Sequence, residues 1–118
     1  MITFQSTNPK WGDACDQIYY SKWLTSDMGA EKPALISTGQ GRTTCSYFMP
    51  GDSTIIYAST HLRSAACPHV PPRRTDGKYT WSIYNSFDIF IADLKGNILK
   101  QLTNSPGYDA EPTVSPKG

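Results

Sequence analysis

Apolar and β-branched residues occur along the chain in short runs that alternate with polar residues and are separated by turn residues. Such runs, bounded by Gly, Pro, Asn or Asp, are typical of β-strands. Eight strands are predicted on this basis, at residues 2–6, 17–21, 33–37, 44–49, 55–59, 87–92, 98–103 and 112–115. The segments 50–52 and 95–97 contain Gly, which tolerates the positive φ of a tight turn. The helical pattern is weak, with one candidate turn at 23–29, so the sequence predicts an antiparallel all-β fold.

The second half of the chain repeats the order of segments found in the first half. The matching pairs are residues 2–7 with 55–60, 17–20 with 88–91, and 35–38 with 101–104. The offset changes from 53 to 71 to 66 along the chain, which places an extra stretch in the second copy between Thr60 and Phe87. Each copy holds four strands, as a β-propeller blade does. The alternative is a coincidental similarity between two pairs of hairpins.

The stretch 101–116, Gln-Leu-Thr-Asn-Ser-Pro-Gly-Tyr-Asp-Ala-Glu-Pro-Thr-Val-Ser-Pro, resembles the repeat of TolB-like β-propellers. That repeat also occurs in the propellers of prolyl-oligopeptidase-type enzymes. The segments 15–19, 41–45, 59–62 and 66–68 resemble one bacterial subgroup with a long insertion. The chain departs from the family pattern at its turns, where an Asp is missing before Lys117 and Gly51-Asp52 is reversed. The resemblance implies a ring of six blades and a periplasmic or secreted setting, although the chain shows no signal sequence.

The strand order indicates that the chain begins at the second strand of a blade, so that its two blade equivalents are offset by one strand from whole blades. Residues 1–54 supply the second, third and outer strands of a first blade and then the inner strand of the next. Residues 55–118 supply the rest of that blade and a spare inner strand at 112–115. Two blades cannot close a ring, because propellers have about four to eight.

Association of copies head to tail removes the open strand edge that a two-bladed monomer would expose. We expect the spare strand of one chain to complete the first blade of the next. The predicted seam consists of Ile2, Phe4, Pro112, Thr113 and Val114. Six blades require a homotrimer, while a dimer, a tetramer and an open fibre are the alternatives.

Strand alternation brings the long loops after the second strands and the connections after the outer strands to one end of the molecule. Loops on a rigid scaffold commonly carry function, so we expect a ligand or a protein partner at this face. The candidate residues are Arg42, His61, His69, Tyr108, Asp109 and Glu111. A ring of carboxylates there would suit calcium. The favoured interpretation is that Asp109 caps the turn after Gly107 and that Glu111 pairs with Arg42. The aromatic residues of the loop, and its Arg73-Arg74 pair, are interpreted as packing and as a solvated surface.

Three cysteines leave at least one thiol without a partner in the chain, and the candidate disulfide joins Cys15 to Cys45. Zinc binding by His61, Cys67 and His69 is a weaker alternative, because their spacing matches no zinc motif. The sequence therefore predicts no metal site and no cofactor.

Composition narrows the functional classes further. The 118 residues carry a formal charge of only +1, which argues against binding to nucleic acid, and no apolar run approaches the length of a membrane span. No Gly-x-Ser-x-Gly nucleophile motif is present. The sequence predicts a non-catalytic, self-assembling propeller scaffold or binding module. The alternative is a two-blade fragment of a longer propeller that serves as an interaction or substrate-gating domain of a periplasmic protein or a peptidase.

Overall fold

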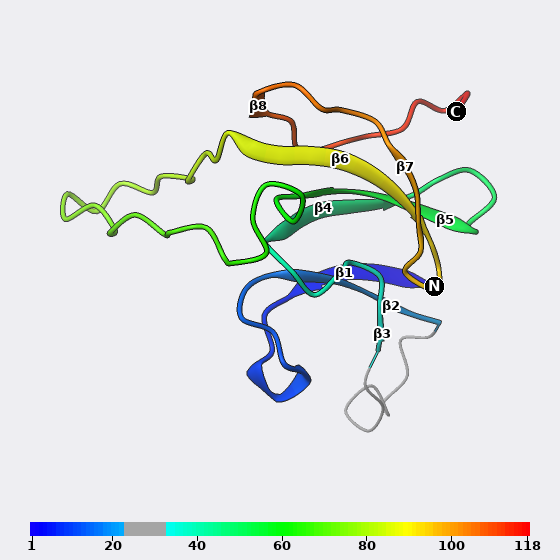
Figure 1. The fold of residues 1–118 in the computed structure, drawn as a ribbon, viewed down its shortest axis with the longest axis horizontal. Helices are drawn as coiled ribbons and strands as arrows, with labels where there is room; N and C mark the ends of the chain where they lie inside the picture. Colours follow the sequence, from blue (N-terminus) through cyan, green and yellow to red (C-terminus); the bar gives the residue numbers. More distant parts are fainter. Residues whose placement is uncertain (23–32) are drawn as a thin grey trace.

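The computed structural model describes residues 1–22 and 33–118, and it is an all-β protein with two sheets (Figure 1). The first sheet has the strand order β1-β2-β3, and the second, which is curled, has the order β4-β5-β6-β7 with β8 paired to β6. The elements are β1 (Ile2–Ser6), η1 (Pro9–Trp11), β2 (Gln17–Ser21), β3 (Ala34–Leu35), β4 (Thr43–Phe48), β5 (Thr54–Ser59), β6 (Ser86–Asp93), β7 (Ile98–Gln101) and β8 (Gly107–Tyr108).

Seven of the eight predicted strands are present, and consecutive strands pair antiparallel within each sheet in the predicted order. The prediction of a strand at 112–115 is wrong for the isolated chain, because no strand of the described residues pairs with that segment. The short strand β8 was not predicted, and it pairs parallel with the start of β6. The weak helical pattern at 23–29 lies outside the described residues.

The two sheets pack face to face over a single apolar core. Alternate residues of each strand point to this interface, as the period of a β-strand requires. The core residues are Ile18, Tyr20 and Ile36 from the first sheet and Ile55, Tyr57, Phe90 and Ala92 from the second. All are at most 7% exposed, so burial of apolar surface holds the sheets together.

Both sheets contain the same backbone hydrogen bond at positions related by the sequence repeat. In the first sheet the Ile36 amide donates to the Ile18 carbonyl at 2.9 Å. In the second sheet the Leu102 amide donates to the Ile89 carbonyl at 2.7 Å. The acceptors are 71 residues apart and the donors are 66 apart, which are the offsets found in the sequence.

Beside each of these backbone hydrogen bonds, a side-chain hydroxyl accepts a hydrogen bond from a backbone amide. The Ile18 amide donates to Ser37 Oγ at 2.9 Å, and the Ile89 amide donates to Thr103 Oγ1 at 3.0 Å. One backbone and one side-chain hydrogen bond therefore recur at the offsets of the sequence repeat.

Within residues 1–22 and 33–118 the structure contains no helix with the length and hydrophobicity needed to cross a membrane.

Candidate functional site

A pocket of about 530 Å³ lies between the long β5–β6 loop and the strand ends beside it. The loop projects from the second sheet (Figure 1, light green to yellow). The pocket is at the face where the sequence placed the candidate residues. Its chemically informative lining residues are Arg42, Arg73, Lys78, Trp81, Tyr84 and Tyr108.

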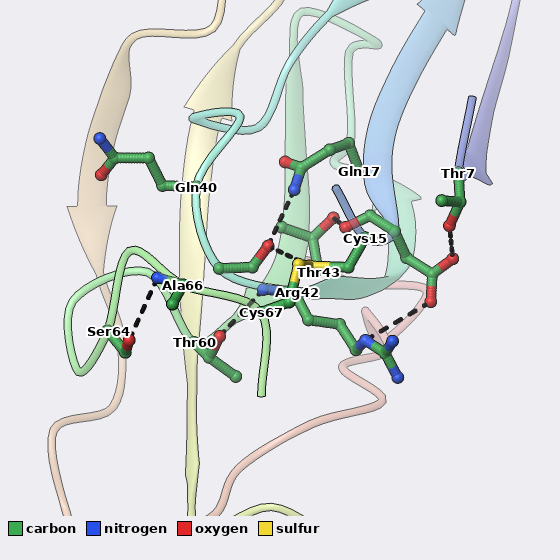
Figure 2. Close-up of a disulfide and its surroundings, with 12 residues drawn as sticks. Thr7, Cys15, Gln17, Gln40, Arg42, Thr43, Thr60, Ser64, Ala66 and Cys67 are labelled. Carbon is green, nitrogen blue, oxygen red and sulfur yellow. Dashed lines mark hydrogen bonds and ion pairs between the residues drawn. A yellow bond between two sulfur atoms is a disulfide. The ribbon is translucent and has the colours of Figure 1, made fainter. Parts of the chain in front are cut away.

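A disulfide between Cys15 and Cys67 fastens the start of this loop to the first sheet, with the two Cα atoms 5.9 Å apart (Figure 2). The predicted Cys15–Cys45 disulfide is wrong, and Cys45 is the free cysteine. The start of the loop approaches the backbone before β4, where the Gly41 amide donates to the Ala65 carbonyl at 2.8 Å. This contact lies two residues before Cys67 and helps to place Cys67 beside Cys15.

Hydrogen bonds hold the backbone of Arg42 at the edge of the pocket. The Arg42 amide donates to Thr60 Oγ1 at 2.9 Å, and the Thr60 amide donates to the Arg42 carbonyl at 3.0 Å. Just before it, the Gly41 carbonyl accepts from Gln17 Nε2 at 2.9 Å. The backbone at Gly41 and Arg42 is therefore held by hydrogen bonds with Gln17 in the first sheet and with Thr60 just after β5, as Figure 2 shows.

The Arg42 side chain contacts one carboxylate and one aromatic ring. Its Nε lies 3.8 Å from Asp16 Oδ2, which is an ion pair, and its guanidinium carbon lies 5.9 Å from the centre of the Tyr84 ring. Nε is buried and donates no hydrogen bond within the described residues. The predicted pairing of Arg42 with Glu111 is wrong, because the carboxylate beside Arg42 is that of Asp16.

Aromatic residues also line the pocket. Strand β8 brings Tyr108 beside Phe87, with ring centres 5.7 Å apart. Trp81 Nε1 donates to the Tyr108 hydroxyl at 3.3 Å, which ties the loop to β8. Tyr84 packs on Phe87 at 6.2 Å, and its hydroxyl is buried without a hydrogen-bond partner in the described part of the chain.

The loop adds basic side chains to the pocket. Arg74 is bound to Asp76 through its guanidinium, and this hydrogen bond lowers the pKa of Asp76. Arg73 and Lys78 take part in no ion pair among residues 1–22 and 33–118. Cations therefore outnumber carboxylates around the pocket.

Of the six predicted face residues, the structure places Arg42 and Tyr108 in the pocket lining. These two are equivalent in the sequence repeat, 66 residues apart. His61 lies apart from the pocket lining, with Nδ1 2.8 Å from Ser59 Oγ and its ring 4.6 Å from that of Phe90. Burial lowers the pKa of His61, and the nearby carboxylate of Asp88 opposes that effect.

The other three predicted residues do not line the pocket. His69 and Glu111 are exposed and Asp109 is half-buried. The alternative of a zinc site formed by His61, Cys67 and His69 is wrong, because Cys67 is in the disulfide and cannot supply a thiolate ligand. No cluster of three metal-ligating side chains occurs in the described ranges.

The sequence reasoning missed the contribution of the loop, because it interpreted Trp81, Tyr84 and Arg73 as packing and solvated surface. The available signal was that one insertion, at residues 73–84, holds three basic residues followed by three aromatic residues, namely Arg73, Arg74 and Lys78, then Tyr79, Trp81 and Tyr84. Comparisons of the chain with protein-family models, curated proteins and solved structures find no match.

Proposed function

We propose that the chain is a non-catalytic scaffold of two TolB-like propeller blades that assembles head to tail, three copies closing a six-bladed ring. The observation that carries the proposal is the backbone of residues 109–114. Among residues 1–22 and 33–118 this segment has no strand partner, yet it repeats the features of β4, which is paired. It therefore has the form of an inner strand that lacks its neighbour.

Two features of the backbone support this equivalence. The Thr43 amide at the start of β4 donates to the Asp16 carbonyl at 2.9 Å, and the Asp109 amide donates to the Phe87 carbonyl at 3.2 Å, at the repeat offsets. Two residues later the chain takes a positive φ in both places.

That positive φ is 53° at Cys45 and 58° at Glu111, and few non-glycine residues adopt it. In β4 it coincides with a bulge, where the register with β5 shifts between Thr44 and Tyr47. A bulge belongs to a paired strand. Glu111 has the same backbone conformation as the bulge residue Cys45, which supports a partner strand that lies outside the single chain.

The repeat identifies that partner as β1 of another copy, because β1 corresponds to β5 at an offset of 53. Within the described residues β1 pairs with β2 alone, so its second edge is open. In Figure 1, β1 lies below the second sheet and the C-terminal segment lies above it, so one chain does not bring the two together. Transfer of the β4–β5 register gives four facing pairs: Asp109 with Ser6, Ala110 with Gln5, Thr113 with Thr3, and Val114 with Ile2.

The sheet faces support the same assembly. Ile36 is fully buried in the core, whereas its repeat equivalent Leu102 is 43% exposed. Ile89 and Ile91 lie on the same outer face of the second sheet and are half-buried. No sheet formed by the described residues covers these side chains, and in the proposed ring the first sheet of a neighbouring copy would cover them.

Cross-linking tests the register directly. We expect Thr3→Cys with Thr113→Cys, in a Cys45→Ser background, to form intermolecular disulfides and covalent multimers up to the trimer under mild oxidation. Facing residues of paired strands have Cα atoms about 5 Å apart, within disulfide reach. The matched control is Gln5→Cys with Thr113→Cys, displaced by two residues, which should cross-link poorly. Equal cross-linking of both pairs, or none in either, overturns the proposal.

The Cys15–Cys67 disulfide supports an oxidising compartment, the periplasm or the cell exterior, because such bonds are rare in the cytosol.

The alternative function is an interaction or gating piece of a longer propeller. A chain that stays monomeric in solution would favour this alternative over the self-assembling scaffold.

A further inference from the structure

We infer that the loop-face pocket binds a small organic anion that carries a planar apolar ring, of which an aromatic carboxylate is the simplest example. The pocket lies within one chain. The inference is argued from the lining of the single chain, of which Gln5 also belongs to the proposed seam between copies.

The charge of the pocket favours an anion. Among the described residues that line it, Arg42, Arg73, Arg74 and Lys78 are cationic, and Asp16 carries the one carboxylate. That carboxylate is already engaged by the Arg42 ion pair and by a hydrogen bond from the Thr7 hydroxyl.

Arg74 is bound to Asp76, which leaves Arg73 and Lys78 as the cations without an ion pair in the described part of the chain. A lining with surplus positive charge attracts an anionic ligand and weakens the binding of a cationic one.

Three buried side-chain polar atoms have no hydrogen-bond partner within the described ranges: Arg42 Nε, the Tyr84 hydroxyl and, in the core away from the pocket, the Tyr57 hydroxyl. Arg42 Nε lies 3.8 Å from Asp16 Oδ2, in ion-pair range but without a hydrogen bond. Buried polar groups in proteins are nearly always satisfied, so each such atom requires an explanation. Arg42 and Tyr84 both line the pocket. A carboxylate supplies only acceptors and forms its strongest hydrogen bonds with a guanidinium, so it matches this pair of donors.

The aromatic residues of the lining favour a flat ring beside the anionic group. Trp81, Tyr84, Phe87 and Tyr108 contribute rings to the lining. The indole N–H of Trp81 donates to the Tyr108 hydroxyl, and Trp81 is 56% exposed, so apolar ring surface is available to a ligand. The volume of about 530 Å³ lies within the range of about 300 to 1,000 Å³ found for small-molecule sites.

Three probes separate the two parts of the inference. The first is 1-naphthoate, which has both the ring and the negative charge. The second is 1-naphthylmethylammonium, which has the ring and the opposite charge, and the third is acetate, which has the charge alone. Binding is followed by isothermal titration and by fluorescence of Trp81, with Trp81→Phe as the variant that identifies its signal.

We expect naphthoate to bind saturably, at least about tenfold more tightly than either of the other probes, and more weakly as salt is added. Lys78→Gln should weaken its binding by about threefold or more. Arg42→Gln should weaken it further. Lys100→Gln, at an exposed position of β7 outside the pocket, should leave binding unchanged.

Because Lys78 is exposed on the loop, its substitution tests the pocket even if Arg42→Gln fails to fold. Equal binding of the two naphthyl probes, or naphthoate binding that Lys78→Gln does not alter, would overturn the inference. Measuring the oligomer mass of the same samples keeps this result separate from the test of assembly.

Discussion

Of the two histidines, His61 is half-buried and is the one whose surroundings are expected to link stability to pH near neutrality. Burial beside Phe90 lowers its pKa from the ordinary value of 6.5, while Asp88 opposes the shift. The folded state therefore binds a proton less readily than the unfolded state does. The contribution of a neutral His61 to stability is complete above 6.5 and is lost as the pH falls through the lowered pKa.

We therefore expect the free energy of unfolding, measured with urea, to decrease between about pH 7.5 and about pH 5.5. His61→Gln should reduce this pH dependence. His69→Gln is the matched control, because His69 is exposed, and it should retain the full dependence. An unchanged slope in His61→Gln would show that another group titrates.

Gly41 is required by both its conformation and its neighbours. Its φ is 61°, and an added Cβ would lie 2.6 Å from Thr60 Oγ1 and 2.8 Å from the His61 amide nitrogen. Gly12 has a φ of 94° but has no atom within 4 Å of an added Cβ. A substitution at Gly12 therefore meets conformational strain alone, and one at Gly41 meets strain and overlap.

We expect Gly41→Ala to lower the free energy of unfolding by about 2–3 kcal/mol and Gly12→Ala by about 1 kcal/mol. Urea denaturation of the two variants measures the difference. Equal effects would mean that the backbone of the β5–β6 loop moves away from residue 41 at little cost.

At the scale of elements, the Cys15–Cys67 disulfide joins β2 to the insertion that forms half of the pocket. The two cysteines are 52 residues apart in the chain. The chain-entropy account assigns about 4 kcal/mol to a loop of that length, and measured values for native disulfides lie at about 2–5 kcal/mol. We expect the double substitution Cys15→Ser and Cys67→Ser to lower the free energy of unfolding by about 2–5 kcal/mol. Cys45→Ser should lower it by less than about 1 kcal/mol.

Alkylation of the denatured, unreduced chain followed by mass measurement checks the connectivity. One modified thiol, at Cys45, is expected. A peptide in which Cys15 is joined to Cys45 would contradict the structure.

The strands that follow from local pattern were predictable. Strands β1 and β2 have the predicted bounds, because alternation and turn residues are properties of neighbouring positions. Strand β8 was missed because a two-residue parallel pairing depends on where a distant loop lies. The disulfide was missed for the same reason, since the approach of Cys67 to Cys15 depends on the folding back of the loop.

The part of the candidate site that depends only on the order and direction of the strands was predictable. Strand alternation placed Arg42 and Tyr108 at one end of the molecule, and both line the pocket. His61 was assigned to the same face, but its ring turns to Phe90 instead. Trp81 and Lys78 were missed, because nothing local to a proline-rich insertion reveals that it encloses a cavity.

At the scale of the whole molecule, the two sheets are related by a repeat, yet their surroundings differ. The first sheet buries Ile18 against the second, whereas Ile89 at the equivalent position faces outwards and is half-buried. The same asymmetry holds for β4, which is paired, and segment 109–114, which has no strand partner among the described residues. A neighbouring copy in the proposed ring would remove both differences at once.

The mass of the protein in solution, measured by native mass spectrometry, tests this account most directly. A chain of 13.1 kDa should give a species of about 39 kDa, three times that mass. Ile91→Lys, which places a charge on the outer face of the second sheet, should shift this species to the monomer. Leu62→Lys, at an exposed turn, should not. A monomer of 13.1 kDa for the unaltered chain would contradict the assembly.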